Sequence, residues 1–528
     1  MKNRIYKIAI VLFSLFTFLG CSSDFLELEP TGKLASEEYL TTEKEAFDAL
    51  IGLYDRMQVN NNNQEDWSSV FLTRVLLSDD SNAGGGSATD QQKFQEIDDY
   101  TQRADNAAVQ NVWKGYYKAI NMANNIIDNV PPELASAETI IAEAKFVRAY
   151  NYFELVTLFG SIPLRLENPK TEADNHVAKS SVEAIYAQIE LDLTAAVASL
   201  PLKSAYSAAY KFRASKGTAQ ALLGKAQLFQ KKYAEAATNF AAVISSEEYD
   251  LEDNYGEIYD GVAKAGKEVV FEILYSSESG NNWDTWDGTG ESNYMTQLMG
   301  IRGDHSFNNL DVALGKEYIN GWGMNVPTRE IGELLEASAA NGDVRGPASV
   351  ISGTDFSAAG GYINSPEAAA IYTGDNKDYE GPGTFNWGDY EGYLRLKYTC
   401  DTLETGKPAF ETNWQFPVKV IRYADVLLMA AEAYLESSQA DKALTEINKV
   451  RVRAGLSNLS SVSLQNIKDE RRLELAFEGH RFFDCVRWGD TSELGPKFTA
   501  GKNELLPIPQ IEIDLNNELS QADQNPGY

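Results

Sequence analysis

Three glutamates near the C-terminus have the spacing at which carboxylates could act together. Glu470, Glu474 and Glu478 stand four residues apart, so a helix would place them on one face. A pair of carboxyl groups can serve as general acid and base on a glycosidic bond. Arg471 and Arg472 lie among them, however, and the run continues with opposite charges at spacing three: Arg481, Asp484 and Arg487. Because such charges pair along a helix, we interpret the run as structural and predict no catalytic residue.

Two tryptophans in a polar stretch offer a different chemistry. Trp283 and Trp286 stand among asparagine and aspartate, with Asn282 and Asp284 as their neighbours. Flat aromatic rings can stack on the apolar faces of sugars, and amide and carboxylate groups can bond the hydroxyls. This stretch is too polar to be core, so we predict that it contacts ligand.

The elements that must position these residues begin with a helical half from about 36 to 270. Apolar residues recur there at spacings of three and four, and glycine or proline ends each run. The expected helices cover 112–129, 137–158, 182–200, 214–230 and 233–244. Trp113, and Trp488 in a later helical pattern, are predicted to be core.

Two helix pairs have the small-residue spacing of tetratricopeptide hairpins. The first combines 221–230 with a second helix carrying Ala236 and Phe240, and the other combines 427–434 with 443–447. Alanines at these positions let two helices approach closely. The fold class is therefore mainly α, with a scaffold at about 36–270 and 418–490.

A loop-rich, aromatic-rich part separates these two scaffold regions, at about 276–417. It holds about half of the glycines, and helical periodicity fades in it. Segments 268–274 and 393–398 are predicted to be short strands. Long loops in a compact protein are usually functional or disordered, and the aromatic content favours function.

The N-terminus resembles a bacterial lipoprotein signal. Lys2 and Arg4 precede an apolar run that ends in Leu19-Gly20-Cys21. The expected signal peptide is 1–20, and residues 21–528 form one expected domain. Lipid on Cys21 would tether the chain to a membrane, whereas an ordinary secretory signal would export it without a tether.

Composition excludes several partners. Lys and Arg total 46 against 77 Asp and Glu, a net charge of −31, which argues against nucleic acid. His176, His305 and His480 lie far apart, so no metal site is predicted. Cys400 and Cys485 are expected to be buried and unpaired, with pairing as the alternative. No cofactor motif is found.

Several motifs in order resemble the SusD/RagB family of outer-membrane nutrient-binding lipoproteins of Bacteroidetes. They are Trp113-Lys114-Gly115-Tyr116-Tyr117, Ala142 to Tyr150 with Phe159-Gly160, Arg422-Tyr423-Ala424-Asp425, Glu470 to Arg481 with Arg487-Trp488-Gly489, and Asn525-Pro526-Gly527-Tyr528.

The resemblance implies a binding protein at the cell exterior, and not an enzyme. Such a protein would capture an oligosaccharide or polysaccharide and deliver it to a SusC-like TonB-dependent transporter, without a cofactor. The segment after Trp67 resembles the region in which family members supply polar ligand contacts. The further candidates are Trp67, Arg74, Asp79, Asp80, Asn82, Trp322 and Trp387. Two alternatives stay open, an exported glycoside hydrolase and a tetratricopeptide-type scaffold that binds protein.

Overall fold

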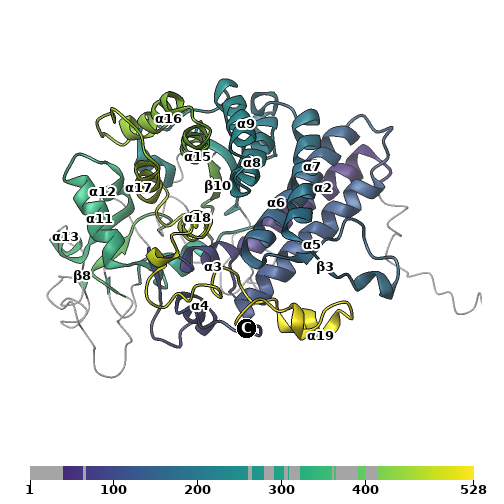
Figure 1. The fold of residues 1–528 in the computed structure, drawn as a ribbon, viewed down its shortest axis with the longest axis horizontal. Coiled ribbons are helices and arrows are strands. Elements are labelled where there is room, and N and C mark those ends of the chain that lie inside the picture. The colour runs from purple at the N-terminus through teal and green to yellow at the C-terminus, as the bar shows by residue number, and fades with distance from the viewer. Residues whose placement is uncertain are drawn as a thin grey trace, which may run out of the picture.

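The computed structural model describes residues 40–62, 67–259, 265–278, 291–302, 307–308, 321–358, 362–363, 390–399 and 413–528 (Figure 1). The helices are α2 (Glu43–Asn61), α3 (Val70–Leu76), α4 (Gln92–Asp98), α5 (Ala107–Asn129), α6 (Ala137–Phe159), α7 (Val182–Ser199), α8 (Lys216–Phe229), α9 (Tyr233–Ser245), α10 (Met295–Met299), α11 (Arg329–Ala339), α12 (Arg345–Ser349), α13 (Gly353–Ala358), α15 (Tyr423–Glu436), α16 (Ala440–Arg453), α17 (Leu464–Glu474), α18 (Arg481–Trp488) and α19 (Gln510–Leu515). The strands are β1 (Ser81–Gly84), β2 (Ile162–Pro163), β3 (Lys179–Ser180), β4 (Val269–Ile273), β5 (Phe307–Asn308), β6 (Met324–Pro327), β7 (Val350–Ser352), β8 (Tyr362–Ile363), β9 (Tyr393–Arg395) and β10 (Val418–Arg422). The mainly helical fold class is confirmed.

The five helices predicted in the first half are present as α5 to α9, and each packs against the next along the chain. Side-chain caps mark the starts of two of these helices. Ser181 accepts a hydrogen bond from the Ala184 amide at the start of α7, and Ser215 accepts one from the Thr218 amide at the start of α8. Helix α5 begins five residues earlier than predicted. The reason is Asn106, whose side chain caps two amides at the new start.

The two predicted hairpins are α8 with α9 and α15 with α16, and α9 also packs against α15 (Figure 1). Close approach depends on small residues. A Cβ atom on Gly224 of α8 would lie 2.7 Å from the ring of Phe240 in α9. Ala236 is fully buried in the same hairpin, and Ala443 and Ile447 are buried in the other. The two hairpins therefore stack as neighbours.

The described strands pair two by two, always antiparallel. Strand β4 matches the strand predicted at 268–274 and pairs with β10, with Ile273 opposite Val418. The strand predicted at 393–398 is shorter, because β9 ends at Arg395. Tyr398 has a φ of +56°, which is outside extended geometry.

The described residues of the loop-rich part contain four helices that the sequence analysis did not predict, α10 to α13, of which α11 is the longest. Helix α11 buries Ile331 and Leu335 at a spacing of four, in a small cluster with Tyr393 and Phe477. The expectation that helical periodicity fades throughout 276–417 is wrong for this segment. Its apolar stripe is only one turn long, and the glycine-rich surroundings obscured it.

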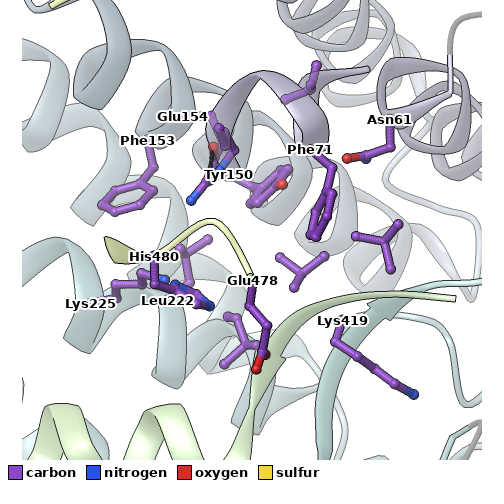
Figure 2. A pocket seen from close by; sticks show the side chains of 15 residues that line it. Asn61, Phe71, Tyr150, Phe153, Glu154, Leu222, Lys225, Lys419, Glu478 and His480 are labelled. Atoms are coloured by element: carbon purple, nitrogen blue, oxygen red, sulfur yellow. Dashed lines mark ion pairs between the residues drawn. The ribbon is translucent and has the colours of Figure 1, made fainter. Parts of the chain in front are cut away.

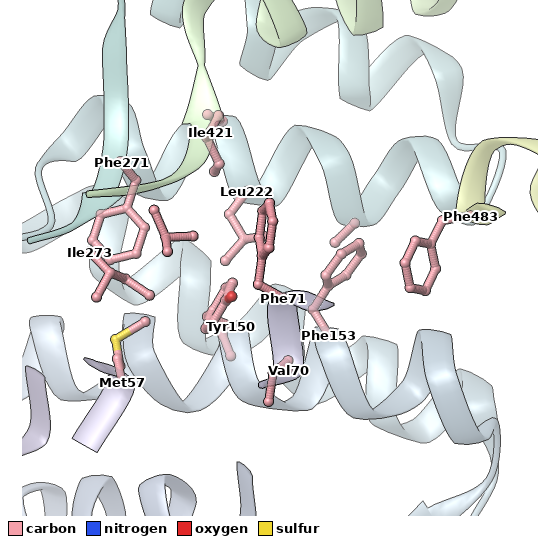
Figure 3. Packing of buried hydrophobic residues seen from close by; sticks show 14 of the residues in the cluster. Met57, Val70, Phe71, Tyr150, Phe153, Leu222, Phe271, Ile273, Ile421 and Phe483 are labelled. Carbon is pink, nitrogen blue, oxygen red and sulfur yellow. The ribbon is translucent and has the colours of Figure 1, made fainter. Parts of the chain in front are cut away.

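One apolar cluster contains residues of both scaffold regions (Figure 3). Phe71 of α3 lies beside Tyr150 of α6 and Leu222 of α8, and Phe271 and Ile421 of the paired strands belong to the same cluster. Burial of such side chains is the dominant favourable contribution to folding. The regions at about 36–270 and 418–490 thus share a core.

Trp113 lies in this core, 2% exposed, as predicted. Trp488 is half-buried instead, and its indole N–H donates to Glu432. Cys485 is buried and free, whereas Cys21, Cys400 and His305 lie outside the described residues. Within the described ranges, no helix combines the length and apolar character needed to cross a membrane, and no group of three metal-ligating side chains is found.

Candidate functional site

Three aromatic residues from distant segments meet in the part of the molecule where α3, α10 and β6 begin. The ring centroids of Trp67 and Trp322 are 5.0 Å apart at 66°, and those of Trp67 and Tyr294 are 5.1 Å apart at 75°. Both tryptophans are partly exposed, whereas Tyr294 is fully buried. We call these three residues the aromatic cluster. Edge-to-face contacts of this kind hold ring orientations in place.

Glycines on either side fix the position of Trp322. A Cβ atom on Gly321 would lie 2.2 Å from the Cα of Gly300. Gly323 has a φ of +71°, and a Cβ atom there would lie 2.4 Å from the hydroxyl of Tyr390. The Trp322 amide donates to the carbonyl of Gln297 at 2.9 Å. The sequence Gly-Trp-Gly therefore lets the backbone come close enough to its neighbours to hold the indole beside Trp67.

The other two members are held by polar contacts. Trp67 has a φ of +58°, and the next residue, Ser68, accepts a hydrogen bond from the Asn111 side chain at 3.1 Å. The Tyr294 hydroxyl donates to the carbonyl of Asn62 at 3.0 Å, and the Asn62 side chain accepts from the Met295 amide at 3.1 Å. The cluster is thus pre-organised by its own protein.

Polar groups of β1 lie near the segment that carries Trp322, because Gly84 of β1 pairs with Met324 of β6. Asn82 is partly exposed, and its side-chain amide donates to Glu391 at 2.9 Å. Glu391 also accepts from the Arg329 amide. Partly exposed indoles can stack on a sugar ring. Amide and carboxylate groups nearby can bond the hydroxyls of that sugar.

Arg74, Asp79 and Asp80 have their charges engaged by protein partners. Arg74 forms an ion pair with Glu154 and lies 4.5 Å over the ring of Phe483. Asp79 accepts from Arg472 and Arg481, and Asp80 accepts from Arg472, in a set of four residues that we call the Asp79 group. The side chains of Asp79 and Asp80 are only 7% and 1% exposed. These contacts support packing, and a ligand role for these residues stays a prediction.

The glutamate run is part of a buried network of charges that we call the ionic layer. Its members come from five separate places in the chain: Glu268, Arg345, Arg422, Arg453, and the run that holds Glu474 and Glu478. Arg422 is 3.0 Å from Glu474 and 2.8 Å from Glu478, while Arg453 is 2.7 Å from Glu268. All of these side chains are at most 5% exposed.

The expected pairing along one helix is wrong for most of this run. Helix α17 ends at Glu474, and the chain turns at Phe477 and Gly479, where φ is +65° and +75°. Glu478 therefore lies outside the helix. Only Asp484 and Arg487 pair within one helix, at 2.8 Å, and the remaining pairs connect different elements.

The charges of this layer oppose acid–base catalysis. Burial alone would raise the pKa of Glu478, but Arg422 and Lys397 lower it to about 2. Burial lowers the pKa of the His480 ring to about 3. At neutral pH the carboxylate is thus ionised and the imidazole is neutral. A glycosidase acid instead needs a carboxyl group whose pKa is raised, so Glu478 is not suited to that role.

A cavity beside this layer lies inside the core (Figure 2). Tyr150, Glu154, Lys225 and His480 are among the residues that line it. It has room for water-sized molecules in about 30 Å³. A cavity of this size suits buried water and is too small for a sugar.

The remaining predicted site residues lie outside the described residues. They are Asn282, Trp283, Asp284, Trp286 and Trp387, and their ligand role stays a prediction. Of the candidates that are described, the structure brings Trp67 and Trp322 together. Sequence reasoning missed Tyr294, and its only signal was an aromatic residue in the polar segment before Met295.

Two family models match the chain. One is described as the SusD family and matches residues 267–503, and the other is described as starch-binding associating with outer membrane and matches residues 24–228. SusD-like protein P2 of Formosa agariphila is 29% identical over 99% of this chain and 99% of its own length. The starch-binding protein SusD of Bacteroides thetaiotaomicron is 24% identical over 75% of this chain and 74% of its own.

Solved structures agree with these matches. A laminarin-binding SusD-like protein has 31% sequence identity and a TM-score of 0.79, and the match covers 92% of this chain and 100% of that one.

Proposed function

The chain belongs to the SusD family, and from this premise we propose that it is a surface lipoprotein that captures a glycan and delivers it to a SusC-like TonB-dependent transporter. The observation that carries the proposal is the aromatic cluster. Two partly exposed tryptophans, with ring centroids 5.0 Å apart, are held in fixed orientations and supply the kind of side chain that stacks on sugar rings.

The names of the relatives support a glycan as the ligand. A protein that is 31% identical to this chain binds laminarin, and a more distant relative is a starch-binding protein. Both ligands are neutral glucans, so we propose neutral glucans as the first class to examine.

The proposed location is the outer membrane, facing the exterior. The match to a family associated with the outer membrane supports the membrane, and the Leu19-Gly20-Cys21 sequence supports a lipid anchor on Cys21. Transfer to a transporter would then need no diffusion of the captured ligand away from the cell.

Isothermal titration of the chain from Ser22 onward, without lipid, tests the proposal. The ligands are laminarin, starch and a panel of other plant, host and microbial polysaccharides. We expect saturable binding of one class. A folded sample that binds none of them would contradict glycan capture, and would favour a scaffold that binds protein.

A second measurement separates capture from hydrolysis. After long incubation of the purified chain with the ligand that binds, the reducing ends are counted. We expect no release, since the named relatives are binding proteins and the ionised Glu478 is not suited to act as a general acid. Release of reducing ends that scales with protein concentration would favour the hydrolase.

A further inference from the structure

An open cleft lies beside α5. Helix α5, the segment 163–176 and α19 enclose about 390 Å³ between them, and we call this space the α5–α19 cleft. Figure 1 shows α19, in yellow, beside α5. The volume is within the range of small-ligand sites.

Cations outnumber acids in this cleft, although the whole chain carries −31. Lys114, Lys118 and Arg165 line it against Glu172 and Glu512. Among the residues that the structure describes, exposed Lys114 has neither a hydrogen bond nor an ion pair. Arg165 donates to a backbone carbonyl at 2.5 Å and has no carboxylate within ion-pair distance in the same set of residues. The charge of Lys114 is therefore available to a ligand.

One of the two acids is engaged inside the protein. Burial raises the pKa of Glu512, while a hydrogen bond from the Trp113 side chain and the charge of Arg165 act in the opposite direction. Glu512 is thus held by a core tryptophan, whereas Glu172 is exposed at the opening.

Another open groove shows that this charge balance is local. The groove beside α15 and α16 is larger, about 840 Å³, and contains Asp250, Glu252 and Asp253. Its two cations, Lys449 and Arg453, already pair with glutamates. That groove offers no comparable cation to an anionic ligand.

The cleft is joined to the aromatic cluster by one face of α5. Asn111, Lys114, Lys118 and Asn121 follow one another at spacings of three and four, so they lie on the same helical face. Asn111 bonds Ser68, which follows Trp67. From Asn111 to Asn121 the helix rises about 15 Å. A glycan chain of several residues could therefore reach from the cluster to the cleft.

We propose that the α5–α19 cleft is a second subsite, which binds an anionic substituent, a sulfate ester or a carboxylate, on a glycan held by the aromatic cluster. The inference rests on the proposed function, and it extends the ligand class to acidic glycans. Lys114 supplies an exposed charge in a cleft that Lys118 and Arg165 also line, and Asn121 and Asn175 offer amide groups to neighbouring hydroxyls.

Three probes with one backbone test it: laminarin, sulfated laminarin and carboxymethylated laminarin, each titrated into the chain from Ser22 onward. We expect at least one anionic derivative to bind about threefold to tenfold more tightly than laminarin at low salt. The advantage should shrink as salt is added, because the contacts are exposed. Which derivative gains identifies sulfate or carboxylate as the preferred group.

The variant Lys114→Ala/Lys118→Ala should lose this advantage and keep the affinity for laminarin. The matched control is Lys44→Ala/Lys231→Ala, which removes the same charge from exposed lysines that do not line the cleft. Equal losses in both variants, or an advantage that survives in the cleft variant, would overturn the inference.

The remaining outcomes separate the two proposals. Tight binding of laminarin with no gain from either derivative overturns the second subsite and leaves glycan capture standing. Absence of binding by all three probes overturns the second subsite, and it overturns glycan capture as well only if the wider panel of polysaccharides also fails to bind.

Discussion

The aromatic cluster and the ionic layer differ in charge and in how deeply their side chains are buried. In the ionic layer, Glu474 is fully buried and three arginines reach it from other elements. In the aromatic cluster, Trp67 and Trp322 contact each other and remain partly exposed. The dense charge of this molecule therefore belongs to a structural network, whereas we propose that the partly exposed rings contact the ligand.

The difference teaches that residue type alone does not identify a site. Burial opposes ionisation, so buried charges persist only where partners compensate them, and the compensation uses up their chemistry. The indoles of the aromatic cluster carry no charge, so their partial burial does not require such compensation. Variants in the two regions should therefore separate loss of stability from loss of binding.

Removing one arginine from the ionic layer should have the largest effect. Arg422→Ala leaves Glu474 and Glu478 buried without their shared partner. We expect the free energy of unfolding to fall by about 3–5 kcal/mol, measured by urea denaturation. The folded fraction should bind glycan normally. A selective loss of affinity would break the distinction between the two regions.

The double variant Trp67→Ala/Trp322→Ala should show the reverse behaviour. We expect glycan affinity to fall by about 2–4 kcal/mol in titration, with a smaller loss of stability than in Arg422→Ala. Trp488→Ala is the tryptophan control, since this half-buried indole lies outside the cluster. Unchanged affinity, combined with weaker binding in Trp283→Ala/Trp286→Ala, would move the site to that loop.

Acid should destabilise the protein partly through His480. The pKa of histidine is about 6.5 in unfolded chains, and that of His480 is about 3 in the fold. The unfolded state therefore binds more protons between these values, and stability falls as pH decreases from about 6.5 by about 1.4 kcal/mol per pH unit.

The variant His480→Gln lacks this titrating group, so its free energy of unfolding should fall less steeply between about pH 6.5 and 5. Glu478 contributes only below this pH range. Urea midpoints at several pH values measure the slope. His176→Gln controls for the loss of a half-exposed histidine. Identical slopes in the wild type and His480→Gln would contradict the assignment.

Asp79→Ala tests whether Asp79 has a structural role or a ligand-binding role. Asp79 is predicted to contact ligand, and it accepts hydrogen bonds from Arg472 and Arg481. We expect a loss of about 2 kcal/mol in stability and no loss of glycan affinity. Weaker binding with unchanged stability would instead support the ligand contact predicted for Asp79.

Asn82→Ala should have the smallest effect, about 1 kcal/mol on affinity, if its amide bonds a sugar hydroxyl. Titration with the same glycan measures it. Thr89→Ala is a control on an exposed polar residue that follows the same strand. Equal affinities in the two variants would exclude Asn82 from the site.

The sequence predicted the parts of the fold that depend on local signals. The ends of α6 and α7 follow from Gly160 and from the proline after Leu200, and the hairpins follow from alanine spacing. The sequence could not reveal which arginine meets Glu474, because Arg345, Arg422 and Arg453 come from three distant segments. Tyr294 was missed for the same reason, since it meets Trp67 across more than two hundred residues of chain.

The pairing of β4 with β10 has a consequence for the order of assembly. Helices α5 to α9 contact their neighbours along the chain, so they can form while later residues are still being synthesised. Phe271 of β4 packs on Phe146 of α6, but the edge of β4 stays open until Val418 and the residues after it arrive. An unpaired apolar edge can join the edge of another chain. A nascent or truncated chain that stops before β10 should therefore be prone to self-association, and completing this one strand pair should be a late step of folding.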